Sequence, residues 1–173
     1  MSYKLLKEIL GFPPAPFEWL DVQRCVFNID EQQYGIFVES FTIDKKYNTV
    51  NISFGRLSNA ASFHSPSDLD TTLSGTGRPR FVLSTVSAAC LENTEVQHAD
   101  IICLAASDEH SAKRGVVYSI AASEIRQFTP GFHGTELRTV KTENGAILTL
   151  MIKRTISPED VVTIMTTLKL TKD

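Results

Sequence analysis

A nearly continuous apolar run at 99–106, Ala-Asp-Ile-Ile-Cys-Leu-Ala-Ala, limits the possible folds of this chain most strongly. A run without polar alternation is typical of a central strand that is covered on both faces. Apolar residues at helical spacing flank it, at 79–92 and from 107 to about 127. A buried strand between two helices requires a sheet on which helices pack. We therefore expect an α+β fold.

Three segments before this run have the composition and alternation of strands. They cover 23–29, 34–43 and 48–54, and in the third the apolar residues alternate with the polar Asn51 and Ser53. Because the turns between them are short, we predict that neighbouring strands are antiparallel. The alternation predicts one face on the core and one face nearer solvent.

Two less regular segments surround these strands. Residues 1–21 are expected to form a short helix followed by a proline-rich arm that tucks onto the body. Residues 55–77 form a long irregular stretch, in which 69–73 could add a short strand. Loops of this length are uncommon inside a compact domain and are often functional.

The C-terminal part predicts a hairpin and a helix. Strands at 137–142 and 146–153 flank an Asn-Gly pair, which is the strongest short-range hairpin signal. A serine, a proline and two acidic residues then open a helix predicted over 157–173. The expected fold is a single domain, 1–173, with a central mixed, mostly antiparallel sheet flanked by helices.

Composition excludes several classes of protein. The chain has 17 basic and 20 acidic residues and a net charge of −3, so nucleic-acid binding is not expected. No apolar run approaches the roughly 20 residues of a membrane span, and charges interrupt the N-terminal apolar residues, so a cytoplasmic location is expected. Cys25, Cys90 and Cys103 lack a paired spacing and are interpreted as buried thiols of a reducing compartment.

A glycine-containing segment before the helix at 79 is the first candidate for chemistry. Glycines let backbone N–H groups approach an anion, and a helix N-terminus adds free donors and partial positive charge. The alternative is a tight turn into the helix. The candidate residues for binding a phosphate or pyrophosphate are Ser74, Gly75, Thr76, Gly77 and Arg78.

The order of these segments resembles the core of the GNAT (GCN5-related N-acetyltransferase) fold. In that family a Gln/Arg-x-x-Gly-x-Gly/Ala loop binds the pyrophosphate of acetyl-CoA, and 72–77 resembles it with threonine at the first position. A later family helix reads roughly Asn-x-x-Ala-x-x-Leu-Tyr, and 111–118 resembles it in the tyrosine and the aliphatic residue before it. The resemblance implies that Ser111 and Arg114 lie near the cofactor and that Tyr118 protonates the CoA thiolate.

Residues 70–125 also resemble small phage-encoded GNAT-like proteins. Matching segments are Thr76-Gly77, a Val-Leu-Ser-Thr-Val helix start, the run at 99–106 and an Arg-x-x-Val-Tyr sequence that ends at Tyr118. A phage origin would imply host takeover or an anti-defence role, in the host cytoplasm.

Few other residues offer catalytic chemistry. Glu39 on the second predicted strand is a candidate general base, and the alternative is an exposed strand charge. His64 and His133 lie in predicted loops and are interpreted as solvated. No metal-ligand spacing and no Ser-His-Asp arrangement is present, so no metal is expected.

Three hypotheses follow. The first is an acyltransferase that moves an acetyl group from acetyl-CoA to an amine on a small molecule or a host protein. The second is a catalytically inactive GNAT-like protein that binds or inhibits a host (defence) protein, which the departures from the family motifs favour. The third is a structural or assembly protein, a homodimer through the C-terminal hairpin or helix.

Overall fold

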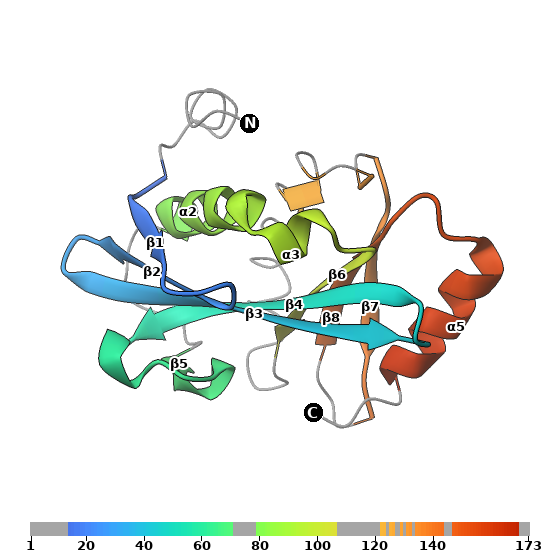
Figure 1. Ribbon diagram of the computed structural model, residues 1–173, viewed down its shortest axis with the longest axis horizontal. Helices are drawn as coiled ribbons and strands as arrows, with labels where there is room; N and C mark the ends of the chain where they lie inside the picture. The colour runs from blue at the N-terminus through green and yellow to red at the C-terminus, as the bar shows by residue number, and fades with distance from the viewer. Residues whose placement is uncertain are drawn as a thin grey trace.

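The computed structural model describes residues 14–70, 79–106, 122–123, 125–126, 129, 131–132, 134–143 and 147–169. In this part of the chain, eight strands form one sheet in the order β1-β2-β3-β4-β6-β8-β7, and β5 pairs with the far end of β4 (Figure 1). The pair β4–β6 is parallel, and every other pairing of the described strands is antiparallel. The prediction of an α+β fold with a mixed, largely antiparallel sheet is confirmed.

The first half of the sheet is a meander of four strands. They are β1 (Phe17–Trp19), β2 (Arg24–Ile29), β3 (Gln32–Ile43) and β4 (Tyr47–Leu57). The predicted antiparallel pairing of the last three is confirmed. The strand β1 corrects the prediction of an irregular arm, because Phe17 to Trp19 pair with β2.

The second half of the chain alternates helices and strands. It contains β5 (Leu69–Asp70), α2 (Pro79–Glu92), the short α3 (Thr94–Gln97), β6 (Ile101–Ala106), β7 (Leu137–Lys141), β8 (Ile147–Ile152) and α5 (Pro158–Lys169). The predicted strand at 99–106 and the predicted hairpin are confirmed. Residues 122–123 and 125–126 are helical, and most of the helix predicted from 107 to 127 lies outside the described residues.

The larger core lies between the sheet and α2, on what we call the α2 face. Residues of β2, β3 and β4 on this face pack against the apolar residues of α2. The predicted inward stripe of α2 is confirmed, because Val82, Val86, Ala89 and Cys90 are all buried. The arm before β1 is anchored there as well, since the N–H of Ala15 donates to Thr85 Oγ1 over 2.9 Å.

A second core lies on the opposite face of the sheet, which we call the α5 face. There Ile164 and Leu168 of α5 pack on β6, β7 and β8 (Figure 1). Because helices cover both faces at β6, the side chains of Ile101 to Leu104 are all buried. Within the described residues, no helix is long and apolar enough to cross a membrane.

The other end of the α5 face is covered by the segment 58–70. Gly35 and Gly55 lie opposite each other in the β3–β4 ladder and leave room for it. A Cβ atom at Gly35 would lie 2.8 Å from Leu69 Cδ2 and 2.9 Å from Phe63 Cε2. A Cβ atom at Gly55 would lie 2.5 Å from the carbonyl oxygen of Asp70. The two glycines therefore allow β5 and its preceding turns to pack on the sheet.

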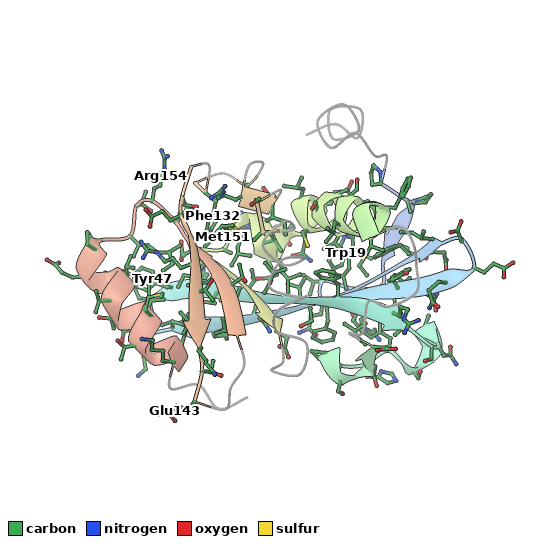
Figure 2. All side chains as sticks on the ribbon, turned by 180° about the vertical axis from the view of Figure 1, so that it is seen from behind. Trp19, Tyr47, Phe132, Glu143, Met151 and Arg154 are labelled. Atoms are coloured by element: carbon green, nitrogen blue, oxygen red, sulfur yellow. The ribbon has the colours of Figure 1, made fainter. Side chains whose placement is uncertain are left out.

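The N-terminus of α5 is fixed to the β3–β4 turn. The hydroxyl of Tyr47 donates to Asp160 Oδ2, and Lys46 Nζ lies 3.3 Å from the same oxygen. Ser157 Oγ accepts from the N–H of Asp160 over 3.2 Å, as the predicted N-cap should. Figure 2 shows Tyr47 beside α5. This contact joins segments that are 113 residues apart.

Candidate functional site

The parallel strands β4 and β6 part in the middle of the sheet. Their ladder joins Thr49–Ile52 to Ile101–Leu104 and ends there, although both strands continue. The ladder of β4 with β5 begins at Arg56. Residues 53–55 therefore lie between two ladders on this side of β4. The carboxyl ends of adjacent parallel strands are a common position for a ligand site.

The short strand β5 keeps the far end of β4 away from β6. Arg56 Nη2 forms an ion pair with Asp70 Oδ2 over 2.9 Å, next to the close approach at Gly55. Asp68 fixes the preceding turn, because its carboxylate accepts from the N–H groups of His64 and Ser65. These two hydrogen bonds also lower the pKa of Asp68 below its ordinary value. The predicted extra strand is thus present, at Leu69–Asp70.

A polar row crosses the sheet where β4 and β6 begin to part. Glu39 of β3 lies opposite Asn51 of β4, and Asn51 lies opposite Cys103 of β6, all on the α5 face. Directly opposed antiparallel residues have Cβ atoms about 4.5–5.5 Å apart. The carboxylate of Glu39 and the side-chain amide of Asn51 are therefore neighbours. The row ends one position before Ile52, the last β4 residue in the ladder with β6.

The side-chain oxygen of Asn51 is buried and lacks a hydrogen-bond donor among the described residues. A buried acceptor without a donor costs about 1–3 kcal/mol, so such an atom indicates a missing partner. Glu39 is half-buried and adds a second acceptor beside it. Together the two side chains suit a ligand that carries several N–H donors, such as an ammonium group.

Cys103, the third member of this row, is not a nucleophile. Its side chain is 2% exposed, and burial raises the pKa of its thiol to about 12. The thiol is therefore protonated at neutral pH and behaves as a small apolar side chain. It is the last residue of the row, on β6, and it adds no charge.

Most of the residues singled out in the sequence lie outside the described residues. Of the predicted site residues, the structure describes Glu39, and it brings this residue beside Asn51. Asp70 and Pro79 flank the predicted anion-binding loop, and Ala106 precedes the predicted tyrosine helix. The predicted residues outside the described ranges are Ser74, Gly75, Thr76, Gly77, Arg78, Ser111, Arg114 and Tyr118.

Asn51 is the site residue that the sequence analysis missed. Alternation assigned Asn51 and Ser53 to the solvent side of their strand, whereas both are half-buried on the α5 face. Asn51 is the direct strand partner of Glu39, so only the register of β3 on β4 could have drawn attention to it. His64 is exposed, as predicted, and His133 lies outside the described residues.

No group of three or more His, Cys, Asp or Glu side chains in the described ranges could hold a metal ion. Comparisons of the chain with protein families, with curated proteins and with solved structures found no match. A functional proposal therefore depends on the polar row and on the end of the β4–β6 ladder beside it.

Proposed function

We propose that this protein is a GNAT-like acyltransferase that moves an acetyl group from acetyl-CoA to an amine. The observation that carries the proposal is the parting of β4 from β6 after four ladder positions, beside Asn51 and Glu39. Acetyl-CoA needs such an opening to lie between the two strands. The element order, in which β4 is followed by α2, β6 and a β7–β8 hairpin, supports the same fold.

The proposed binding mode follows the resemblance. The pyrophosphate of acetyl-CoA would bind the backbone N–H groups of 74–77 and the N-terminus of α2, which begins at Pro79. Backbone N–H groups near the opening would polarise the thioester carbonyl. The ammonium form of the acceptor would donate to Asn51 Oδ1 and to the Glu39 carboxylate.

The proposed reaction is a direct transfer. Glu39 accepts a proton from the ammonium group, and the free amine attacks the thioester carbon. The C–N bond would form as the C–S bond breaks, and Tyr118 would donate a proton to the departing CoA thiolate. The amide nitrogen would release its second proton, which restores the Tyr118 phenol by way of solvent. Asn51 keeps a hydrogen bond to the amine nitrogen throughout and orients it.

Calorimetry with CoA and with acetyl-CoA tests cofactor binding directly. We expect saturable binding of both, and an absence of heat at millimolar ligand would refute the acyltransferase. In that case the hypotheses of a non-catalytic binding protein and of a structural protein would remain.

Two substitutions test the residue roles once an accepting amine has been found in a thiol-release assay. Glu39→Gln should lower kcat by about 10²–10⁴-fold and leave CoA affinity unchanged, since only the base is removed. Glu31→Gln, in the β2–β3 turn, is the matched control and should retain full activity. Tyr118→Phe should lower kcat without changing CoA affinity. Equal activity of the two Gln variants would exclude Glu39 as the base.

A further inference from the structure

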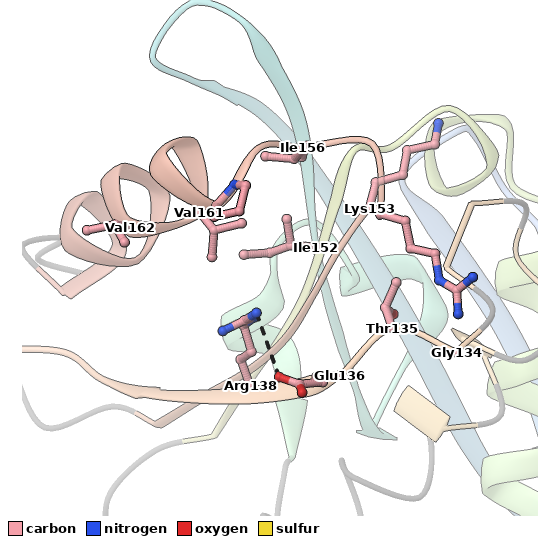
Figure 3. A pocket seen from close by; sticks show the side chains of 11 residues that line it. Gly134, Thr135, Glu136, Arg138, Ile152, Lys153, Ile156, Val161 and Val162 are labelled. Carbon is pink, nitrogen blue, oxygen red and sulfur yellow. Dashed lines mark ion pairs between the residues drawn. The ribbon is translucent and has the colours of Figure 1, made fainter.

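A groove lies at the end of the molecule opposite β1, between α5 and the β7–β8 hairpin (Figure 3). Its volume is about 410 Å³. Ile152 and Ile156 form its floor, and Val161 and Val162 of α5 form one wall. Val162 is 65% exposed, which is unusual for a valine on a helix that packs against a sheet. The groove is separate from the polar row at Glu39 and Asn51.

Positive charge surrounds this apolar floor. The groove is lined by Arg138, Lys153 and Arg154 and by one carboxylate, that of Glu136, although the whole chain has a net charge of −3. Arg138 Nη2 lies 3.7 Å from Glu136 Oε2, and the Glu136 side chain is 80% exposed, so this ion pair contributes little to stability. In the described part of the chain, Lys153 and Arg154 have no carboxylate within ion-pair distance.

The two unpaired cations lie over the loop that precedes β7. The side chain of Lys153 packs over Gly131, and that of Arg154 packs over Gly134. Both glycines have positive φ angles, 84° and 75°, which suit residues without a Cβ atom. The absence of side chains at these two positions leaves room for both cationic side chains beside the groove.

We propose that this groove docks a short acidic segment of a partner protein. One or two aliphatic side chains of the segment pack on Val161, Val162 and the floor, and flanking carboxylates bind Lys153, Arg154 and Arg138. An inorganic anion would leave the apolar wall uncovered. A nucleic acid likewise offers no aliphatic side chain to cover Val161 and Val162. An acidic segment with an aliphatic centre fits both the apolar floor and wall and the surrounding cations. This proposal does not depend on the acyltransferase activity.

The test uses a fluorescein-labelled peptide, Asp-Glu-Leu-Ile-Glu-Asp, in an anisotropy titration with the full chain. We expect saturable binding that weakens as salt is raised, because the cations are near the surface. A peptide with Asn and Gln in place of the four acids should bind at least about 10-fold more weakly. Lack of binding of the acidic peptide at millimolar protein, or equal binding of both peptides, would overturn the proposal.

Variants of the protein locate the binding site. Lys153→Glu and Arg154→Glu should each weaken binding of the acidic peptide by about 10-fold, whereas Lys141→Glu, at the other end of the β7–β8 ladder, should change the affinity less than about 2-fold. Val162→Ser should weaken peptide binding by about 3–10-fold through lost apolar contact. Thermal melts establish that each variant is folded. Equal losses in the groove variants and in Lys141→Glu, or stronger competition by inorganic phosphate or a short RNA than by unlabelled peptide, would refute this assignment.

Discussion

The facing glycines of β3 and β4 decide how the irregular segment 58–70 meets the sheet. Glycine is unfavourable in a strand interior, so its presence at Gly35 and Gly55 needs a packing reason. The reason is the close approach of Phe63 and Leu69 at one glycine and of the Asp70 backbone at the other. The position of β5 therefore depends on these two missing side chains.

Substitution of Gly55 tests this role. In Gly55→Ala, the added Cβ must displace the backbone oxygen of Asp70, which cannot rotate away as a side chain can. We expect a loss of about 1–3 kcal/mol in the free energy of unfolding, measured by urea denaturation. Ser53→Ala, two residues earlier on the same face, is the control and should change the free energy of unfolding by less than about 0.5 kcal/mol. Equal stability of the two variants would show that β5 moves freely.

Single residues also show where prediction of the site from the sequence fails. Glu39 was proposed as a general base because it is a carboxylate on a predicted strand, and its neighbour Asn51 was placed on the solvent side. The difference arises because strand alternation separates two faces without stating which one is covered. Here both faces are covered, by α2 on one side and by α5 and the segment 58–70 on the other.

At the scale of elements, α5 is attached to the sheet by apolar contacts and by one polar cluster. The Tyr47 hydroxyl and then the Lys46 ammonium hold the pKa of Asp160 below its ordinary value of 3.8. The pKa of Tyr47 is raised, chiefly by the same hydrogen bond. The cluster therefore favours the folded state while Asp160 is ionised and Tyr47 is protonated, which holds at neutral pH.

The lowered pKa of Asp160 gives a pH-dependent prediction. A carboxyl group whose pKa is lower in the folded state than in the unfolded state stabilises the folded protein above pH 3.8. This stabilisation is lost as pH falls through the folded pKa. The melting temperature of Asp160→Asn should therefore be lower than that of the wild type at pH 7. The two should converge once the pH has fallen through the folded pKa of Asp160, which lies below 3.8, because the wild-type carboxyl is then protonated.

Thermal melts of both proteins between neutral and acidic pH measure this difference. Glu159→Gln, at the adjacent exposed position, is the control for loss of a negative charge at the start of α5. A constant gap between Asp160→Asn and wild type across the whole pH range would contradict the role assigned to the ionised carboxylate.

Elements with a strong periodic signal were predicted well, and elements that depend on tertiary contact were not. The positions of β2, β3, β4, β6, α2 and α5 agree with the predicted segments within a few residues. The strand β1 was missed because its three residues follow prolines, and it exists through pairing with β2. The short helix α3 was missed as well, and Asn93 caps it by accepting from the N–H groups of Glu95 and Val96.

At the scale of the whole molecule, the three cysteines report on the integrity of the two cores. Cys25 and Cys90 lie in the core under α2, and Cys103 lies in the core under α5. All three are free thiols, as the sequence predicted. Burial raises the pKa of Cys25 and of Cys103 to about 12 and also raises that of Cys90.

This burial predicts that the native protein resists thiol reagents. With Ellman's reagent at pH 8, the folded chain should release almost no thionitrobenzoate within minutes, and all three thiols should react in denaturing urea. The slow native rate should then follow opening of the cores and rise with added urea. Rapid native labelling of even one thiol would show that a core is open to solvent.

The short ladder between β4 and β6 also has a consequence for the order of folding. The pairings within β1–β4 and between β7 and β8 connect residues close in sequence, whereas Thr49 meets Ile101 across a long intervening loop. Closing that loop costs entropy before contacts repay it. We therefore expect the β1–β4 meander and the β7–β8 hairpin to form early. The long-range ladders of β6 with β4 and with β8 should form late, as measured by pulse-labelling hydrogen exchange during refolding.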